Sequence, residues 1–229
     1  MSSDCESDFR LLIFDWDGTL MDSIGTIVAC TQATFTELGL APLPEPTVRE
    51  TIGLGLKEVM AVLQPGAGEE FRRQVTEVYY KHWLSTYRDT APLFPRVRET
   101  LEELAAEGYL LAVATGKSRR GLDRDLQRSA THHLFAATRT VDEAPGKPHP
   151  QMVLDLLDEL GVRPQQALVI GDTTYDLQMA KDAGSHALGV TSGSHHRQQL
   201  MALKPLDCLS NVVELGPWLQ QRAVAVAAG

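Results

Sequence analysis

The chain has 229 residues, of which 43% are hydrophobic and 22% are charged, as is typical of a globular protein with a substantial core. Its 21 basic and 30 acidic residues give a formal net charge of -9. A surface this acidic repels polyanions, which argues against binding to nucleic acids or to anionic membranes. A small anionic substrate remains compatible, because salt screens the distant charges beyond roughly 8 Å.

The cysteines and the chain start indicate a compartment. Cys5, Cys30 and Cys208 are scattered and form no CxxC pair, which predicts reduced thiols and argues against zinc-ribbon or thioredoxin-like sites. Residues 1–8 lack the basic and apolar regions of a secretory signal. No apolar run approaches the roughly 20 residues that a membrane-spanning helix needs. We therefore expect a cytoplasmic protein without a membrane partner.

The first predicted element is a strand over residues 10–14, where an apolar run stops abruptly at Asp15-Trp16-Asp17-Gly18. A continuous apolar stretch that ends in acidic residues and glycine is typical of a buried parallel strand with a functional loop at its carboxyl end.

The next segment, residues 23–91, has helical patterns only. Helices are expected over residues 24–38, 47–63 and 69–87, with breaks at the glycines and prolines between them. A block of helices directly after the first strand predicts a small inserted helical cap. We expect the cap to comprise residues 22–91 and the catalytic core to comprise residues 1–21 and 92–229.

Strands and helices alternate in the rest of the chain. Further strands are predicted over residues 109–114, 167–170 and 186–190, a weaker one over 135–141, and helices over 97–107, 151–160 and 176–183. This alternation predicts an α/β fold with a Rossmann-like, doubly wound parallel sheet. In such sheets ligands bind beyond the carboxyl ends of the strands, which is where the polar residues of this chain occur.

Two carboxylates follow the first strand. If the chain curls at Gly18, the side chains of Asp15 and Asp17 approach one point, and Thr19 adds a hydroxyl group. The pair fits metal binding or acid–base chemistry, and a simple surface turn is the alternative.

Two more polar segments follow later strands. Thr115-Gly116-Lys117-Ser118 offers a hydroxyl and successive backbone N–H groups that suit a phosphate, although a helix N-cap uses the same residues. Lys147 lies between prolines in Pro145-Gly146-Lys147-Pro148, which favours a fixed cation, with a solvated loop lysine as the alternative.

The last motif is Gly171-Asp172-Thr173-Thr174-Tyr175-Asp176, at the end of a strand and the start of a helix. The four-residue spacing puts Asp172 and Asp176 on one side of a first helical turn, and carboxylate oxygens are the ligands that Mg²⁺ prefers. Asp176 as an ordinary N-cap residue is the alternative.

These four ordered motifs together resemble the haloacid dehalogenase superfamily of phosphatases, over roughly residues 10–213, and the helical insert resembles that family's α-helical cap. The phosphoglycolate-phosphatase-like branch is the most similar. The resemblance implies that Asp15 is the nucleophile and forms an aspartyl-phosphate, and that Asp17 is the general acid and base. It implies that Thr115 holds the phosphoryl group and that Lys147 neutralises Asp15 and the phosphate.

The resemblance also implies a Mg²⁺ site formed by Asp15, by the backbone carbonyl of Asp17, by Asp172, and by Asp176, which either binds the ion or orients Asp172. It implies contacts to the phosphate from Gly116 and Lys117.

A cap loop, residues 51–57, is similar to the family's substrate-facing loop, so Gly53 and Lys57 are candidate substrate contacts. A helix start with an exposed lysine is the alternative for this loop. Arg119 and Arg120 are further candidates near the substrate, whereas His195 and His196 are expected to be surface residues.

The first motif also separates this chain from its relatives. Dehalogenases and phosphonate-cleaving members of the superfamily lack the second acid, which is present here as Asp17. Sugar-phosphate mutases carry a histidine soon after the two acids, and residues 21–32 contain none.

The expected function is therefore Mg²⁺-dependent hydrolysis of a small phosphate ester similar to phosphoglycolate, by a monomer or homodimer. A nucleotide or sugar-phosphate phosphatase, a pyrophosphatase, and a binding scaffold without turnover are the alternatives.

Overall fold

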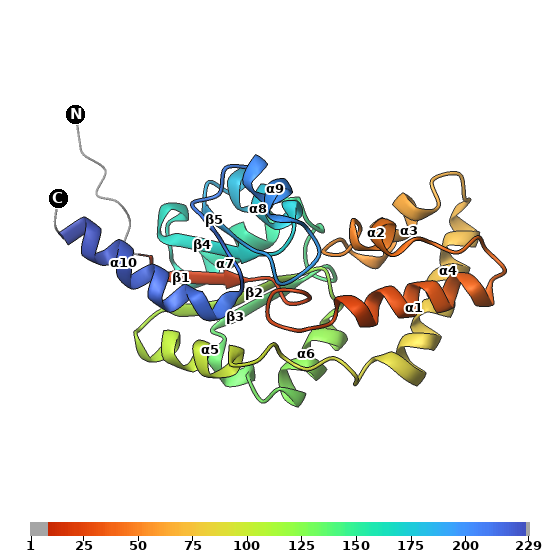
Figure 1. Cartoon of the computed structure of the whole chain (residues 1–229), viewed down its shortest axis with the longest axis horizontal. Coiled ribbons are helices and arrows are strands. Elements are labelled where there is room, and N and C mark those ends of the chain that lie inside the picture. The colour runs from red at the N-terminus through yellow and green to blue at the C-terminus, as the bar shows by residue number, and fades with distance from the viewer. Residues whose placement is uncertain (1–8, 228–229) are drawn as a thin grey trace.

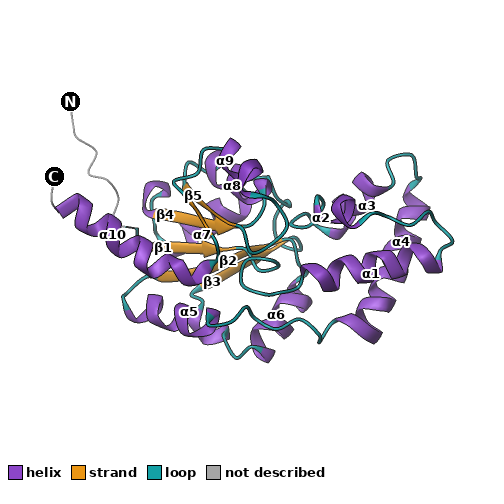
Figure 2. Cartoon of the chain, viewed as in Figure 1, coloured by secondary structure: helices purple, strands orange, loops and turns teal. Residues whose placement is uncertain are grey.

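The computed structural model describes residues 9–227, and its centre is a six-stranded parallel sheet (Figure 2). The strand order is β3-β2-β1-β4-β5-β6, with β1 at the centre between β2 and β4. The strands are β1 (Leu11–Phe14), β2 (Leu110–Thr115), β3 (Ala137–Thr140), β4 (Ala167–Gly171), β5 (His186–Val190) and β6 (Cys208–Leu209).

Helices cover both faces of the sheet, because successive side chains of each strand point to opposite faces. Leu12 and Phe14 of β1 pack in one apolar layer, and Leu11 and Ile13 pack in the other. The first layer contains side chains of α5 (Val97–Ala106), α6 (Arg119–Arg128) and α10 (Leu215–Ala227), and the second contains side chains of α7 (Gln151–Leu160) and α8 (Thr174–Asp182). The doubly wound α/β fold that the alternation predicts is confirmed.

Apart from α9 (Arg197–Ala202) and the short 3-10 helices η2 (His132–Leu134), η3 (Pro164–Gln166) and η4 (Val212–Glu214), the remaining helices lie between β1 and β2 in the chain. Figure 1 shows this helical block grouped beyond one end of the sheet. Its helices are α1 (Ile24–Glu37), α2 (Glu45–Arg49), α3 (Leu56–Leu63), α4 (Glu69–His82) and the π-helical turn η1 (Trp83–Tyr87). Apolar side chains of this block form two clusters of their own, around Val48 and around Phe35. These separate clusters support our proposal that residues 22–91 form a cap.

The predicted helix over residues 47–63 is wrong in one respect, because the chain forms two helices there. Gly53 has a φ of 101°, which lies outside the helical region, and α3 begins only after Gly55. The loop between α2 and α3 consequently points its backbone toward the core.

The two connections between the helical block and the sheet run side by side. Met21 and Leu93 form an antiparallel bridge, and the N–H of Asp22 donates to the carbonyl of Pro92 at 2.9 Å. Asp17 also bridges to Met21, so the first connection begins within the acidic motif itself.

The structure also bears on the expected thiols and membrane contacts. Cys30 and Cys208 are buried and free, while Cys5 and the chain start, residues 1–8, lie outside the described residues. Within residues 9–227 no helix combines the length and the apolar character that crossing a membrane requires.

Candidate active site

The predicted motifs meet at the carboxyl edge of the sheet. Asp15 follows β1 and its N–H donates to the carbonyl of Ile170 in β4, so it continues the ladder by one residue. Asp172 follows β4 and Thr115 ends β2, so these residues come from the two strands that flank β1. Lys147 lies in the loop after β3. Adjacent parallel strands thus bring residues from four distant segments to one place.

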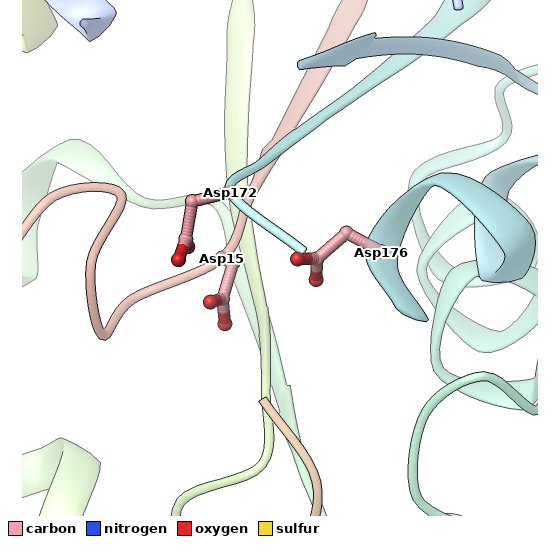
Figure 3. A group of neighbouring side chains, drawn as sticks. All are labelled: Asp15, Asp172 and Asp176. Carbon is pink, nitrogen blue, oxygen red and sulfur yellow. The ribbon is translucent and has the colours of Figure 1, made fainter. Parts of the chain in front are cut away.

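Three carboxylates converge there from different elements. Asp15, Asp172 and Asp176 are buried, and one oxygen of each lies within 4.8 Å of the others. Figure 3 shows the three side chains gathered at the ends of their elements. Lys147 is also buried, and its Nζ lies 2.5 Å from Asp15 Oδ1 and 2.6 Å from Asp176 Oδ1. One ammonium group therefore faces three carboxylates in a place from which water is largely excluded.

The excess of carboxylates over ammonium groups, together with burial, changes the pKa values of Asp15 and Asp172. Burial raises the pKa of Asp15 well above its usual value; Asp176 and Asp172 add to the effect, and Lys147 opposes it. Burial and the neighbouring Asp176 raise the pKa of Asp172 to about 7. Asp15 Oδ2 is buried without a hydrogen-bond donor. Hard oxygen donors with excess negative charge and an unpartnered oxygen fit a divalent cation such as Mg²⁺, which Asp15 and Asp172 would hold.

We expect the apparent Kd for Mg²⁺ to fall as the pH rises from about 6 to about 8, because the cation competes with a proton for Asp172. Below pH 7 the change approaches about tenfold for each pH unit, because one proton is displaced. The measurement is the melting temperature of the protein at increasing Mg²⁺ concentrations, repeated at each pH. Asp172→Asn should remove the response, and Asp158→Asn, at an exposed position, should retain it. An affinity that does not change with pH would contradict this assignment.

Asp172 is oriented by donors from two other segments. Thr19 Oγ1 donates to Asp172 Oδ1 at 2.8 Å, and the N–H of Ser194 donates to Asp172 Oδ2 at 2.7 Å. Gly18 makes this approach possible, since a Cβ atom there would lie 2.6 Å from Asp172 Oδ2 and its φ is 84°. The glycine in the first motif therefore leaves space for the Asp172 carboxylate as well as turning the chain.

Asp176 is the third residue of α8 in a capping box, and Thr173 is the N-cap residue. The N–H and hydroxyl of Thr173 donate to Asp176 Oδ2 at 3.1 and 2.6 Å, while Asp176 Oδ1 faces Lys147. Oδ2 is thus held by its own loop, whereas Oδ1 has an ionic partner but no hydrogen bond, so direct coordination of a cation and an orienting role both stay open for Asp176.

Asp17 is not part of the cluster of three carboxylates and has its own partners. Ser23 Oγ donates to Asp17 Oδ1 at 2.6 Å, and Lys117 Nζ donates to both oxygens at 3.0 and 3.1 Å. In this arrangement the Asp17 carboxylate accepts hydrogen bonds from a hydroxyl and from an ammonium group, and its role in proton transfer stays a prediction.

Lys117 was predicted as a phosphate contact, and its backbone N–H donates to Thr115 Oγ1 at 3.2 Å. Its side chain has a role that the sequence did not reveal. Nζ lies 3.1 Å from Asp125 Oδ2 and 5.4 Å from the centre of the Trp83 ring. Asp125 interrupts the apolar face of α6 between Leu122 and Leu126, and that interruption was the available signal.

Gly116 and Gly53 bring the cap loop onto the core. A Cβ atom at Gly116 would lie 2.7 Å from the carbonyl oxygen of Gly53 and 2.8 Å from that of Leu54. A Cβ atom at Gly53 would lie 3.1 Å from Thr173 Oγ1. Both glycines therefore permit close packing of the cap loop against the core, and their expected contacts with a substrate stay predictions.

Lys57 does not reach this site. It is exposed on α3, which turns Leu56, Met60 and Leu63 inward, so the alternative of an exposed helix-start lysine holds.

The arginines that follow the second motif do not face the site either. The guanidinium of Arg119 pairs with Glu143 at 2.6 Å and Asp123 at 3.1 Å, and Arg120 is exposed.

His195 is not the surface residue that the sequence suggested, although His196 is exposed. His195 is buried, its Nδ1 accepts a hydrogen bond from the N–H of Thr174 at 3.0 Å, and its own N–H donates to the carbonyl of Asp172 at 3.2 Å. It therefore holds the segment between Asp172 and Thr174 through two hydrogen bonds.

Comparison with known proteins agrees with this geometry. The family model described as haloacid dehalogenase-like hydrolase matches residues 12–190. The chain belongs to this family. It is 29% identical to phosphoglycolate phosphatase of Psychrobacter arcticus, over 93% of this chain and 96% of the relative. It is 36% identical to phosphoglycolate phosphatase of Aquifex aeolicus, over 77% of this chain and 82% of the relative.

A solved structure of a haloacid dehalogenase-like family hydrolase from Streptococcus pneumoniae has a similar fold, with a TM-score of 0.81 and 26% identity. The match covers 92% of this chain and 98% of that one. Family membership, relatives and fold together identify the chain as a phosphatase, a hydrolase of phosphoric monoesters, as the motifs predicted.

Because the candidate site lies at the sheet edge beside Gly116, we expect Gly116→Ala to lower kcat/KM about 10- to 100-fold. The added methyl group would meet two backbone carbonyls, which cannot rotate away, and would displace the cap loop from the core. Gly25→Ala is the control, because a Cβ atom there meets nothing within 4 Å. Steady-state kinetics on a simple phosphomonoester measures the difference, and equal values for both variants would contradict the close contact.

Proposed function

We propose that the chain is a Mg²⁺-dependent phosphatase that hydrolyses small phosphomonoesters through an aspartyl-phosphate on Asp15. The observation that carries this proposal is the buried Asp15 carboxylate, which has one oxygen on Lys147 and the other without a donor, beside Asp172. In such a carboxylate one oxygen is paired with an ammonium group, and the other has no hydrogen-bond donor that would weaken it as a nucleophile or as a metal ligand.

In the first half of the reaction an Asp15 oxygen attacks phosphorus and the bond from phosphorus to the leaving oxygen breaks. Asp17, in its protonated form, gives its proton to that oxygen, so an alcohol departs and the phosphoryl group remains on Asp15. The hydroxyl of Thr115 and the Nζ of Lys147 stabilise the charge on the phosphoryl oxygens.

In the second half a water molecule attacks the same phosphorus atom. The Asp17 carboxylate takes the proton of the water, the bond between phosphorus and Asp15 breaks, and inorganic phosphate leaves. The hydrogen bonds from Ser23 and Lys117 hold Asp17 at the position that this step requires.

The electrostatic problem is the approach of a phosphate dianion to three carboxylates. Lys147 offsets part of this charge from within the cluster. Mg²⁺, when held by Asp15, Asp172 and the backbone carbonyl of Asp17, supplies the remaining positive charge. Asp176, Thr19 and Ser194 keep the metal-binding groups and Lys147 in place.

Phosphoglycolate is the reference substrate, because two of the relatives carry that name. Nucleotides, sugar phosphates and pyrophosphate are the other compounds to compare. A cytoplasmic location is part of the proposal and is supported by the free thiols of Cys30 and Cys208. A monomer or a homodimer is proposed as the active form.

Phosphate release from a panel of phosphomonoesters, with and without Mg²⁺, tests the proposal. We expect release that requires the cation, and a phosphoryl group on Asp15 in rapidly quenched samples. A binding scaffold of the same fold would release no phosphate from any ester, and that result would end the proposal.

A further inference from the structure

A cavity of about 150 Å³ lies beside Asp17, between the helical block and the sheet edge. Its walls include Ile27 of α1, Val48 of α2 and Val59 of α3 on one side, and Lys117 on the other. Because Asp17 has to reach the leaving oxygen of the substrate, the group attached to that oxygen extends into this cavity. An apolar cavity of about this volume in another protein holds benzene.

The cavity walls are mainly apolar and aromatic. Tyr79 and Trp83 stack with an interplanar angle of 9° and both line the space. The threonine hydroxyls at the wall have partners already, since Thr31 donates to the carbonyl of Ile27 and Thr51 donates to that of Val48. These hydroxyls therefore do not require a polar ligand.

Among the described residues that line the cavity, the only cationic side chain is Lys117, and its ammonium group is occupied. Asp17 contacts it at 3.0 Å, Asp125 contacts it at 3.1 Å, and the Trp83 ring covers a further side. Burial works against the charged form, yet the two carboxylates raise the pKa of Lys117, so it stays charged and paired.

The other ionic groups at the wall are acidic. Asp142 lines the cavity, and its Oδ2 accepts a hydrogen bond from the backbone N–H of Arg119 at 2.7 Å. A second anionic group on the substrate would lie near the carboxylates of Asp17 and Asp142. It could pair with Lys117 only if that ammonium group gave up its ion pairs with the two carboxylates that now contact it. Placing a charge there without a partner is strongly unfavourable.

Building on the phosphatase function proposed above, we propose that the preferred substrates are phosphomonoesters of uncharged alcohols that carry an apolar group up to about the size of a benzene ring. The phosphate of such a substrate occupies the site at Asp15, and its apolar part replaces water against Val59, Tyr79 and Trp83. Phosphoglycolate, whose leaving group bears a carboxylate, is then a poor substrate.

The test compares benzyl phosphate, ethyl phosphate and phosphoglycolate with the wild-type protein and Mg²⁺, since all three release unactivated alcohols. We expect kcat/KM for benzyl phosphate to exceed each of the other two at least about tenfold. A value for phosphoglycolate equal to or above that for benzyl phosphate would overturn this inference and leave the phosphatase function intact. No release from any of the three would overturn this inference, and the wider panel of phosphomonoesters would then decide the phosphatase function.

A pair of variants on α3 locates the effect in the cavity. Val59→Lys places a cation at the wall, and we expect it to lower the ratio of kcat/KM for benzyl phosphate to that for phosphoglycolate at least about tenfold. Val62, three residues along, is 57% exposed and outside the cavity, so Val62→Lys should leave the ratio unchanged. An unchanged ratio in Val59→Lys, or an equal change in both variants, would contradict the assignment. If Val59→Lys does not fold, the comparison in the wild type decides alone.

Discussion

Asp15→Asn is expected to lower kcat/KM by about 10⁴-fold or more, because the amide is a poor nucleophile and the covalent route is lost. The change removes one of three mutually repelling carboxylates and leaves Lys147 paired with Asp176 at 2.6 Å. The free energy of unfolding should therefore stay the same or rise in the absence of metal. Urea unfolding and steady-state kinetics on one protein preparation measure both quantities.

The control for this variant is Asp158→Asn, at an exposed position on α7. It makes the same change of charge away from the sheet edge and should retain full activity and stability. Quenched samples supply a second reading, since phosphoryl transfer to the protein should be seen in the control and be absent in Asp15→Asn. Turnover by Asp15→Asn near the wild-type rate would show that another group attacks phosphorus.

Lys147→Met should have the largest effect on stability. The ammonium group lies between Asp15 and Asp176, and all three side chains are buried. Removing one partner of a buried ion pair leaves carboxylates without a counter-charge, which costs about 3–5 kcal/mol. Activity should fall about 10²- to 10³-fold as well, since the phosphoryl charge loses a donor. Denaturant unfolding near neutral pH without Mg²⁺ measures the first effect.

The pH dependence of this destabilisation has a definite sign. Burial already raises the pKa of Asp15 well above its usual value, and the loss of Lys147 removes the group that opposes this shift. An acid with a raised pKa in the folded state keeps its proton while the unfolded chain loses it near pH 4. Stability is therefore lost as the pH rises above that value. The difference in the free energy of unfolding between wild type and Lys147→Met should be smaller near pH 5 than near pH 8.

A double variant separates electrostatics from packing. If unpaired charge causes the destabilisation, Lys147→Met combined with Asp15→Asn should be more stable than the sum of the two separate effects predicts. A double variant with the sum of the two separate effects would show instead that the lysine stem contributes mainly by filling space.

The strands of the sheet, and the polar residues at their carboxyl ends, were predictable because the signal for each lies within a few consecutive residues. β1, β2, β4 and β5 are continuous apolar runs, and each is followed by glycine or polar residues at the point where a parallel strand presents its ligands. Asp15 and Asp172 were therefore identifiable from their positions alone. The two-residue β6 was not predicted, since Cys208–Leu209 is too short to carry a periodic pattern.

The contacts of Lys117, His195 and Lys57 were not predictable, because they depend on packing between segments that are distant in the sequence. Lys117 meets Asp125 and Trp83 only because α6 and the turn η1 lie on either side of it. His195 carries no motif, and its burial follows from the position of the loop behind Asp172. The direction of Lys57 depended on which face of the short helix α3 packs inward, and the cap loop alone did not decide this.

The paired connections between the helical block and the sheet have a mechanical consequence. Met21 bridges both to Leu93 and to Asp17, and Ser23, two residues further, donates to the Asp17 carboxylate. A rotation of the helices that admits a substrate has to twist this short stretch of chain. If the helical block opens to admit a substrate, we therefore expect the Asp17 carboxylate to change direction with it and to return to its present position on closing.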